Sequence, residues 1–597
     1  MLTLVLALWW PWSARAAEPT PAISAGTDAG LPSATAPSEG EAPFRFRVVV
    51  EAPRPLPDVL NASLGLVRWQ SYADMTEDLF DQLAREAIDE AHEAASTEGF
   101  FSATVDVRVD RATTPATVTV VVTPGDPTRI HAVDVEVTGP AATQSPAAVS
   151  RVRDEWRLPL GAIFRQAAWD EAKQRAVATL AAERYAAARL AQSEANIDPD
   201  AKAADLSLVI DSGPAFRVGT LQIEGTRRYD ADLVRRYSTL RRGDPYALAD
   251  LDQYVRRLSA TGYFASVHAV IDTDPAHADD APVTVSVIEA PPKRIEAGIG
   301  FSTDTRVRAN LNYRDVDFLQ RALQFTADLR LESKVQSASF RVVRPPNANG
   351  WSIAGTTQVE RTDIEGLITE TASIGARGIS LDERNQWEVG PAFLGDVQRP
   401  SGGDRIASHA LYGDVQRTWR RVDDLAAPSR GFIAQVDVGA SVPGVSTRAF
   451  GRVVARFAAW HPIDRENDLS TRLEAGAVIA ASRDGIPSTL LFRTGGDQSV
   501  RGYAYQSLGV QQGDAVLPGR YYGLASVEAT HWIREALGIA AFVDAGDAFD
   551  DHSSRRVAIG YGVGGRVRTP IGPFRLDVAY GQLTRQVRIH FSVGLAF

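Results

Sequence analysis

The sequence contains no cysteine, which excludes a disulfide framework and a thiolate metal site. Its 9 histidines are dispersed, with no His-Glu-x-x-His motif and no paired carboxylate spacing. It also has no phosphate-binding glycine loop and no nucleophile motif. We therefore expect no enzymatic activity, no cofactor and no metal. The formal net charge of -11 argues against nucleic acid as a partner.

Long apolar runs are also missing, apart from one at the start. Residues 1–17 are predicted to be a secretory signal peptide, because Leu2–Trp12 is apolar but too short to span a bilayer, and Ala14-Arg15-Ala16 gives a small-x-small cleavage pattern. The basic residue expected near Met1 is absent. Residues 18–43, rich in Ala, Pro, Ser, Thr and Gly, are predicted to be a disordered linker. A chain of this kind could cross a membrane only as strands.

Residues 44–292 contain a threefold repeat, which divides into 44–127, 128–214 and 215–292. Each unit ends in two strands preceded by a helical segment, and a Gly or Pro turn leads into the next unit. The helical segments are expected at Thr76–Glu98, Ala167–Glu183 and Ala249–Thr261. Each unit should therefore be a small α+β domain with helices on one face of a sheet. The open sheet edges could pair an extended chain, or the units could act as a scaffold for a partner protein.

Residues 293–597 change to repeated alternation of apolar and polar residues, as in Ile295–Phe301 and Leu469–Ala477. Sixteen strands would leave roughly nineteen residues for each strand and its connection, which suits an even-numbered membrane barrel. A soluble β-sandwich would alternate as well. The last strand argues against the sandwich, because Phe591 and Phe597 share an apolar face while Gly594 lies on the other.

One stretch, Phe492–Tyr503, has little strand pattern and contains Gly495, Gly496, Val500, Arg501, Gly502 and Tyr503. Its glycines allow sharp turns and close approach, and Arg501 is one fixed cation. In the later string Phe542–Gly546, side-chain alternation puts Phe542, Asp544 and Gly546 on one face. Glu528 lies on the same face as Tyr522 and Leu524 in the preceding strand. We predict that Arg501 is held by Asp544 and Glu528; the alternative is a solvated loop cation.

These strings carry a resemblance. The Gly495-Gly496 and Val500-Arg501-Gly502-Tyr503 sequences, followed by Phe-x-Asp-x-Gly at 542–546, resemble the sixth-loop and barrel-wall signatures of the outer-membrane protein assembly and translocation superfamily. Pro428–Phe432 resembles its periplasmic turn, and Thr569–Asp577 resembles a late-hairpin motif. The resemblance implies three α+β POTRA domains (44–127, 128–214, 215–292) followed by a 16-stranded antiparallel transmembrane β-barrel (293–597). The chain ending on Phe597 resembles the signal by which such barrels are recognised for insertion.

Three POTRA units are similar to the TamA-like branch of this superfamily. That resemblance implies an outer-membrane location with periplasmic POTRA domains, a TamB-like inner-membrane-anchored partner, and unfolded outer-membrane proteins or autotransporters as substrates in the lipid bilayer. It also implies a link to phospholipid transport. The alternatives are a two-partner-secretion translocator, which usually has two POTRA units and a plug helix, and a simple outer-membrane pore.

The expected mechanism is that the barrel opens at a seam between its first and last strands, near Arg294–Phe301 and Val587–Phe597. A substrate strand then pairs with the exposed edge and leaves sideways into the lipid bilayer. Gly594 is expected to weaken this seam, since glycine contributes no side-chain packing. Arg501, held by Glu528 and Asp544, is expected to brace the opposite wall.

Overall fold

The structure is a computed structural model that describes residues 44–302, 305–425, 428–551, 553, 555–568 and 574–593. Gly594 and Phe597 lie outside the described residues, as do residues 1–43 and residues 569–573 of the late-hairpin string. No described helix is both long and apolar enough to cross a membrane.

The first α+β unit has the element order β-α-α-α-β-β. The order of its sheet is β1-β3-β2, with β1 parallel to β3 and β2 antiparallel to it. Alternate residues of β3 are buried against the helices, as a sheet covered on one face requires. The elements are β1 (Phe46–Glu51), α1 (Leu56–Ser63), α2 (Gly65–Trp69), α3 (Glu77–Thr97), β2 (Thr104–Asp110) and β3 (Ala116–Thr123).

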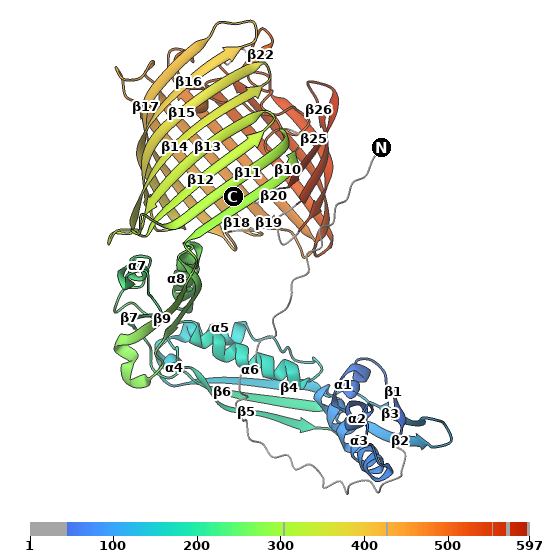
Figure 1. Cartoon of the computed structure of the whole chain (residues 1–597). Coiled ribbons are helices and arrows are strands. Elements are labelled where there is room, and N and C mark those ends of the chain that lie inside the picture. The colour runs from blue at the N-terminus through green and yellow to red at the C-terminus, as the bar shows by residue number, and fades with distance from the viewer. Residues whose placement is uncertain are drawn as a thin grey trace. The chain divides into compact units, whose positions relative to one another are not determined.

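The second unit repeats this plan, with sheet order β4-β6-β5 and the same parallel and antiparallel pairings. Figure 1 shows α5 and α6 lying along one face of its sheet. Its elements are β4 (Arg129–Thr138), α4 (Pro140–Gln144), α5 (Pro146–Asp154), α6 (Gln166–Ala181), β5 (Arg189–Asp198) and β6 (Ala203–Asp211).

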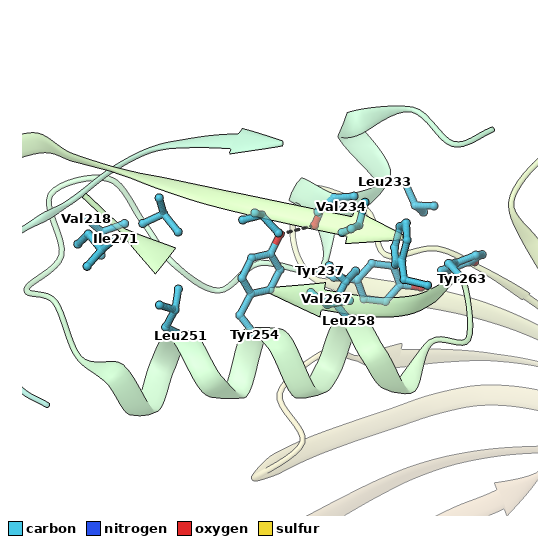
Figure 2. Close-up of a cluster of buried hydrophobic side chains, with 14 of the residues drawn as sticks. Val218, Leu233, Val234, Tyr237, Leu251, Tyr254, Leu258, Tyr263, Val267 and Ile271 are labelled. Carbon is cyan, nitrogen blue, oxygen red and sulfur yellow. Dashed lines mark hydrogen bonds between the residues drawn. The ribbon is translucent and has the colours of Figure 1, made fainter. Parts of the chain in front are cut away.

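The third unit has sheet order β7-β9-β8. Figure 2 shows its core, where Tyr254 and Leu258 of α8 are fully buried, each contributing about 1.5–3 kcal/mol of burial. The hydroxyl of Tyr254 donates a 2.9 Å hydrogen bond to the carbonyl of Val234. Its elements are β7 (Val218–Glu224), α7 (Ala231–Arg236), α8 (Leu248–Ala260), β8 (Phe264–Ile271), the 3-10 helix η1 (Pro275–Asp280) and β9 (Ala281–Glu289).

Contacts join the third unit to the first turns of the following sheet. The Tyr263 hydroxyl donates to the Ala322 carbonyl at 2.6 Å, and Gln324 Nε2 donates to the Thr261 carbonyl at 3.3 Å. This end of the barrel is therefore the one that contacts the third unit.

The predicted sixteen-stranded antiparallel β-barrel is confirmed. Its strands follow one another in chain order, each antiparallel to the next, and Figure 1 shows the sheet curving round into a barrel. The strands are β10 (Lys293–Ser302), β11 (Arg306–Phe318), β12 (Leu323–Glu332), β13 (Val335–Arg344), β14 (Trp351–Ile364), β15 (Leu367–Ser380), β16 (Asn385–Pro400), β17 (Ile406–Val422), β18 (Gly431–Ser441), β19 (Gly451–Pro462), β20 (Asn467–Ile479), β23 (Tyr521–Arg534), β24 (Leu537–Phe549), β25 (Ala558–Val567), β26 (Phe574–Gly581) and β27 (Gln586–Val593).

The wall has an apolar outer face and a polar inner face. In β24, for example, Ile539 and Val543 are exposed on the outside, whereas Phe542 and Asp544 are buried inside. This is the pattern that strand alternation gives when lipid lies outside and a polar lumen lies inside.

The segment between β20 and β23 forms one long loop that folds back into the barrel. It contains the 3-10 helix η2 (Ser488–Leu490) and a small hairpin of β21 (Val510–Gln512) and β22 (Ala515–Leu517). Isolated bridges pair Phe492 with Gly519 and Thr494 with Leu508, so the loop is closed on itself at its base.

Candidate functional site

The inner end of the long loop runs so close to the wall that glycine is required. Gly502 has φ +92°, and a Cβ there would lie 2.7 Å from the backbone nitrogen of Gly581 in β26. Gly495 and Gly496 also have positive φ, at the turn that directs the chain toward the wall. These backbone conformations bring residues 500–503 into contact with the barrel wall.

Arg501 makes a two-pronged contact with Asp544 of β24. Its Nε donates to Asp544 Oδ2 at 2.7 Å and its Nη2 donates to Oδ1 at 2.9 Å, while its backbone N–H donates to Oδ2 at 3.0 Å. Asp544 is fully buried and also accepts from the Ser526 hydroxyl at 2.7 Å. A planar guanidinium fork matches this carboxylate geometry, which a lysine could not reproduce.

The remaining Arg501 nitrogen reaches two further acids. Its Nη1 donates to Glu528 Oε2 of β23 at 2.6 Å and to Asp577 Oδ2 of β26 at 3.3 Å. A second arginine, Arg566 of β25, bridges the same two acids at 2.7 Å and 2.5 Å. We call Arg501, Glu528, Asp544, Arg566 and Asp577 the Arg501 cluster. It joins the loop to four consecutive strands, β23 to β26.

Aromatic and backbone contacts complete the attachment of the loop. The Arg501 guanidinium carbon lies 3.3 Å from the centroid of the Phe542 ring, an attractive cation–π arrangement. The N–H of Gly502 donates to His590 Nε2 of β27 at 2.9 Å. The Tyr503 hydroxyl donates to the Ile559 carbonyl and accepts from the Leu583 N–H, both at 3.0 Å. The loop therefore touches every strand from β23 to β27.

Comparison with known families decides the membership of this chain. The Omp85 superfamily domain matches residues 292–597, about half of the sequence. The chain belongs to the Omp85 superfamily. A POTRA family, described as a surface antigen variable number repeat, matches residues 216–290, which is the third α+β unit.

Named relatives of this Omp85 chain are distant. The outer membrane protein assembly factor BamA of Nitratidesulfovibrio vulgaris is 22% identical over 425 residues, 66% of this chain and 53% of that protein. This chain therefore spans about half the length of that relative. The crystal structure of Haemophilus ducreyi BamA lacking POTRA domains 1–3 has 17% identity and a TM-score of 0.54, and the match covers 78% of this chain and 99% of that one. CdiB from Acinetobacter baumannii has 13% identity and a TM-score of 0.43, covering 78% and 89% of the two chains.

The residues singled out in the sequence of this Omp85 chain fall into two groups. Arg501, Glu528, Phe542 and Asp544 meet in the lumen. Gly546 lies beside them, where a Cβ would lie 2.8 Å from Val500 Cγ2, so its lack of a side chain makes room for Val500. Phe591 lies apart from them, in β27 opposite Leu576.

Three further residues that hold the loop, Arg566, Asp577 and His590, do not stand out in the sequence. Asp577 lies within the hairpin string Thr569–Asp577, and no local motif marks Arg566 or His590. Asp577 and His590 lie directly opposite each other in the register of β26 and β27. Side-chain alternation alone would have placed both on the luminal face, but nothing local in the sequence shows that a loop far away reaches them.

The seam lies next to this clamped wall. β10 and β27 are the two ends of the sixteen-stranded sheet and approach each other where the barrel closes. Among the described residues no ladder of paired residues joins them, whereas every other neighbouring pair of strands is paired. Since Gly502 reaches His590 of β27, the loop braces the wall that ends at the seam. The expectation that it braces the opposite wall is wrong, because the loop crosses the lumen toward the last strands.

Proposed function

We propose that this Omp85 chain is an outer-membrane insertase that admits substrate strands through the seam between β10 and β27. The proposal rests on the difference between the seam and the wall beside it. In the described part of the barrel, β10 and β27 lie next to each other without a ladder of paired residues. The adjacent strands, in contrast, are joined to the long loop by the Arg501 cluster. An unpaired edge offers backbone donors and acceptors to an incoming strand whatever its sequence.

The proposed location is the outer membrane, with the α+β units in the periplasm. We propose that all three units are POTRA domains, bounded by 44–127, 128–214 and 215–292, after a signal peptide at 1–17 and a linker at 18–43. What supports this is the common sheet plan, in which the first strand of each unit is parallel to the last and the last occupies the centre.

Three such units support a TamA-like role. In that role the chain works with a TamB-like inner-membrane-anchored partner and inserts autotransporters and other outer-membrane proteins, with a contribution to phospholipid transport. Strands β2, β5 and β8 are edge strands of their sheets and could pair either a partner or a substrate. The chain performs this work without enzymatic chemistry.

The seam is tested with engineered disulfides, since the chain has no cysteine of its own. A cysteine at Ile299 in β10 is combined with cysteines placed in turn along β27, and insertion of an autotransporter barrel into vesicles holding the full chain is measured. Oxidation should stop insertion and reductant should restore it. The matched control is a pair at Val543 and Tyr561, which lie directly opposite each other in β24 and β25, away from the seam. Equal insertion with the seam locked and unlocked would refute the mechanism.

The partner is tested separately with photo-crosslinking residues at the exposed edges of β2 and β5 in the full chain. Recovery of a very large inner-membrane-anchored protein supports the TamB-like partnership. Recovery of a secreted exoprotein alone favours two-partner secretion through the pore.

A further inference from the structure

Two tryptophans and an arginine form a group on the outer face of β16 and β17. Trp387 and Arg417 lie directly opposite each other, and Trp419 is the next residue on the same face of β17. The Arg417 guanidinium carbon lies 4.4 Å from the centroid of the Trp387 ring and 5.6 Å from that of Trp419. The face is external, because Val415 is exposed on it while Asp414 is buried on the luminal side.

Arg417 carries a charge that the described residues do not neutralise. No described carboxylate lies within 4.0 Å of it, and its polar nitrogens donate no hydrogen bond to described atoms. The contrast is Arg568, which also lies over a tryptophan, Trp532, at 3.6 Å, but has Asp468 3.6 Å away. An arginine that lies against a tryptophan ring in this barrel can therefore also have an acidic partner, and Arg417 differs in having none among the described residues.

A second cation follows on the same outer face. Arg421 donates to Asn385 Oδ1 at 2.7 Å and to the backbone carbonyl of Arg384 at 3.0 Å, and no described acid pairs with it. These residues adjoin the turn that carries Glu383, which lies 3.7 Å from Arg257 in the third α+β unit. The two cations therefore stand at the end of the barrel that the proposed function puts at the periplasmic interface.

An apolar depression of about 720 Å³ begins beside this group. Val436, opposite Arg417, starts a row that continues across the sheet as Ala455, Ala475 and Gly523. Ala434, opposite Trp419, belongs to the next row on the same outer face. Because these cross-strand neighbours are small, the lipid-facing wall is hollowed there, to a volume within the roughly 300–1,000 Å³ range of small-molecule sites.

We propose that this surface docks a glycerophospholipid of the inner leaflet, with its phosphate on Arg417 and Arg421 and an acyl chain in the depression. The inference rests on the proposed membrane location. Indole rings lie at headgroup level in membrane barrels, and here the Arg417 guanidinium lies beside two of them. A guanidinium fork binds phosphate through two N–H donors. A second barrel packed on the hollow would leave both cations unpaired, so charge complementarity favours the phospholipid.

The test is native mass spectrometry of the full chain in detergent with added phosphatidylglycerol or phosphatidylcholine. One cation near an anionic headgroup is worth roughly a fivefold change in affinity. Arg417→Gln should therefore lower retention of phosphatidylglycerol about fivefold and reduce its preference over phosphatidylcholine. The matched control is Arg344→Gln: Arg344 ends β13 opposite the outward-facing Ile353, and no described ring or acid contacts it.

A second variant tests the hollow. Ala475→Phe fills the depression and should reduce retention of both lipids while leaving the preference for phosphatidylglycerol intact. Equal retention of phosphatidylglycerol by the unaltered chain and by Arg417→Gln would overturn the proposal. Reconstitution into vesicles separates the two hypotheses. If the chain enters the bilayer but the unaltered protein and Arg417→Gln retain phosphatidylglycerol equally, only the docking site is refuted. If the chain does not enter the bilayer, the proposed membrane location is refuted.

Discussion

Replacing Arg501 by alanine should release the inner end of the long loop from the barrel wall. The substitution removes the fork on Asp544 and the contacts to Glu528 and Asp577, and these three side chains are 0%, 13% and 6% exposed. Arg566 would then be the one cation left in the cluster for three buried carboxylates. Removing one member of a buried ion pair costs about 3–5 kcal/mol, since the remaining charge stays desolvated without its partner.

The expected result is a loop that opens more often while the barrel stays folded. A cost of 3–5 kcal/mol corresponds to roughly 10²- to 4 × 10³-fold more frequent opening. Hydrogen exchange of residues 494–503, read by mass spectrometry on the full chain in detergent, should accelerate by that factor. Heat-modifiable gel mobility checks that the barrel is intact.

The control for this prediction is Arg456→Ala. Arg456 is also a luminal arginine, but it is 44% exposed and its nearest acid atom, on Glu474, is 3.7 Å away, so its loss should cost about 0–1 kcal/mol. Arg501→Lys keeps a cation beside the acids but cannot make the fork, so its effect should fall between those of Arg456→Ala and Arg501→Ala. Exchange in Arg501→Ala that matches the unaltered chain would show that the cluster does not hold the loop.

Three further predictions concern single positions. Gly502→Ala should lower the stability of the loop attachment by about 2 kcal/mol or more, because the backbone there is left-handed and a Cβ would clash with the backbone of β26. Gly413→Ala has open space around it and should change stability by less than about 0.5 kcal/mol. Hydrogen exchange of the loop measures the effect of both substitutions. Tyr254→Phe should destabilise the third unit by about 1–3 kcal/mol, measured by urea unfolding, because a buried carbonyl loses its donor. Burial acts to raise the pKa of Glu289, but hydrogen bonds donated by three backbone N–H groups outweigh it and lower the pKa. The Glu289 carboxylate should therefore stabilise the third unit fully above the ordinary carboxyl pKa, and this stabilisation should disappear as the pH falls through the lowered pKa. Glu289→Gln should remove that pH dependence of stability.

The sequence was informative where physical rules act over a few residues. Strand alternation placed Phe542 and Asp544 on one face, and helix stop signals put the third helix of the first unit within a residue of its observed ends, Glu77 and Thr97. It was less informative where distant strands meet. The bridging position of Arg566 depends on the register of β25 against both neighbours, which alternation does not determine.

The boundary between β26 and β27 and the seam between β10 and β27 differ in the interactions that must break for the strands to separate. Separating β26 from β27 would break a ladder running from Phe574 opposite Val593 to Gly581 opposite Gln586, and would also break the Gly502 contact to His590. Separating β10 from β27 breaks no ladder among the described residues. Because each lost backbone hydrogen bond facing lipid has no water to replace it, the barrel should part at the seam before it parts at any clamped neighbour. A loop that holds β23 to β27 as one body would therefore confine the proposed opening to a single edge.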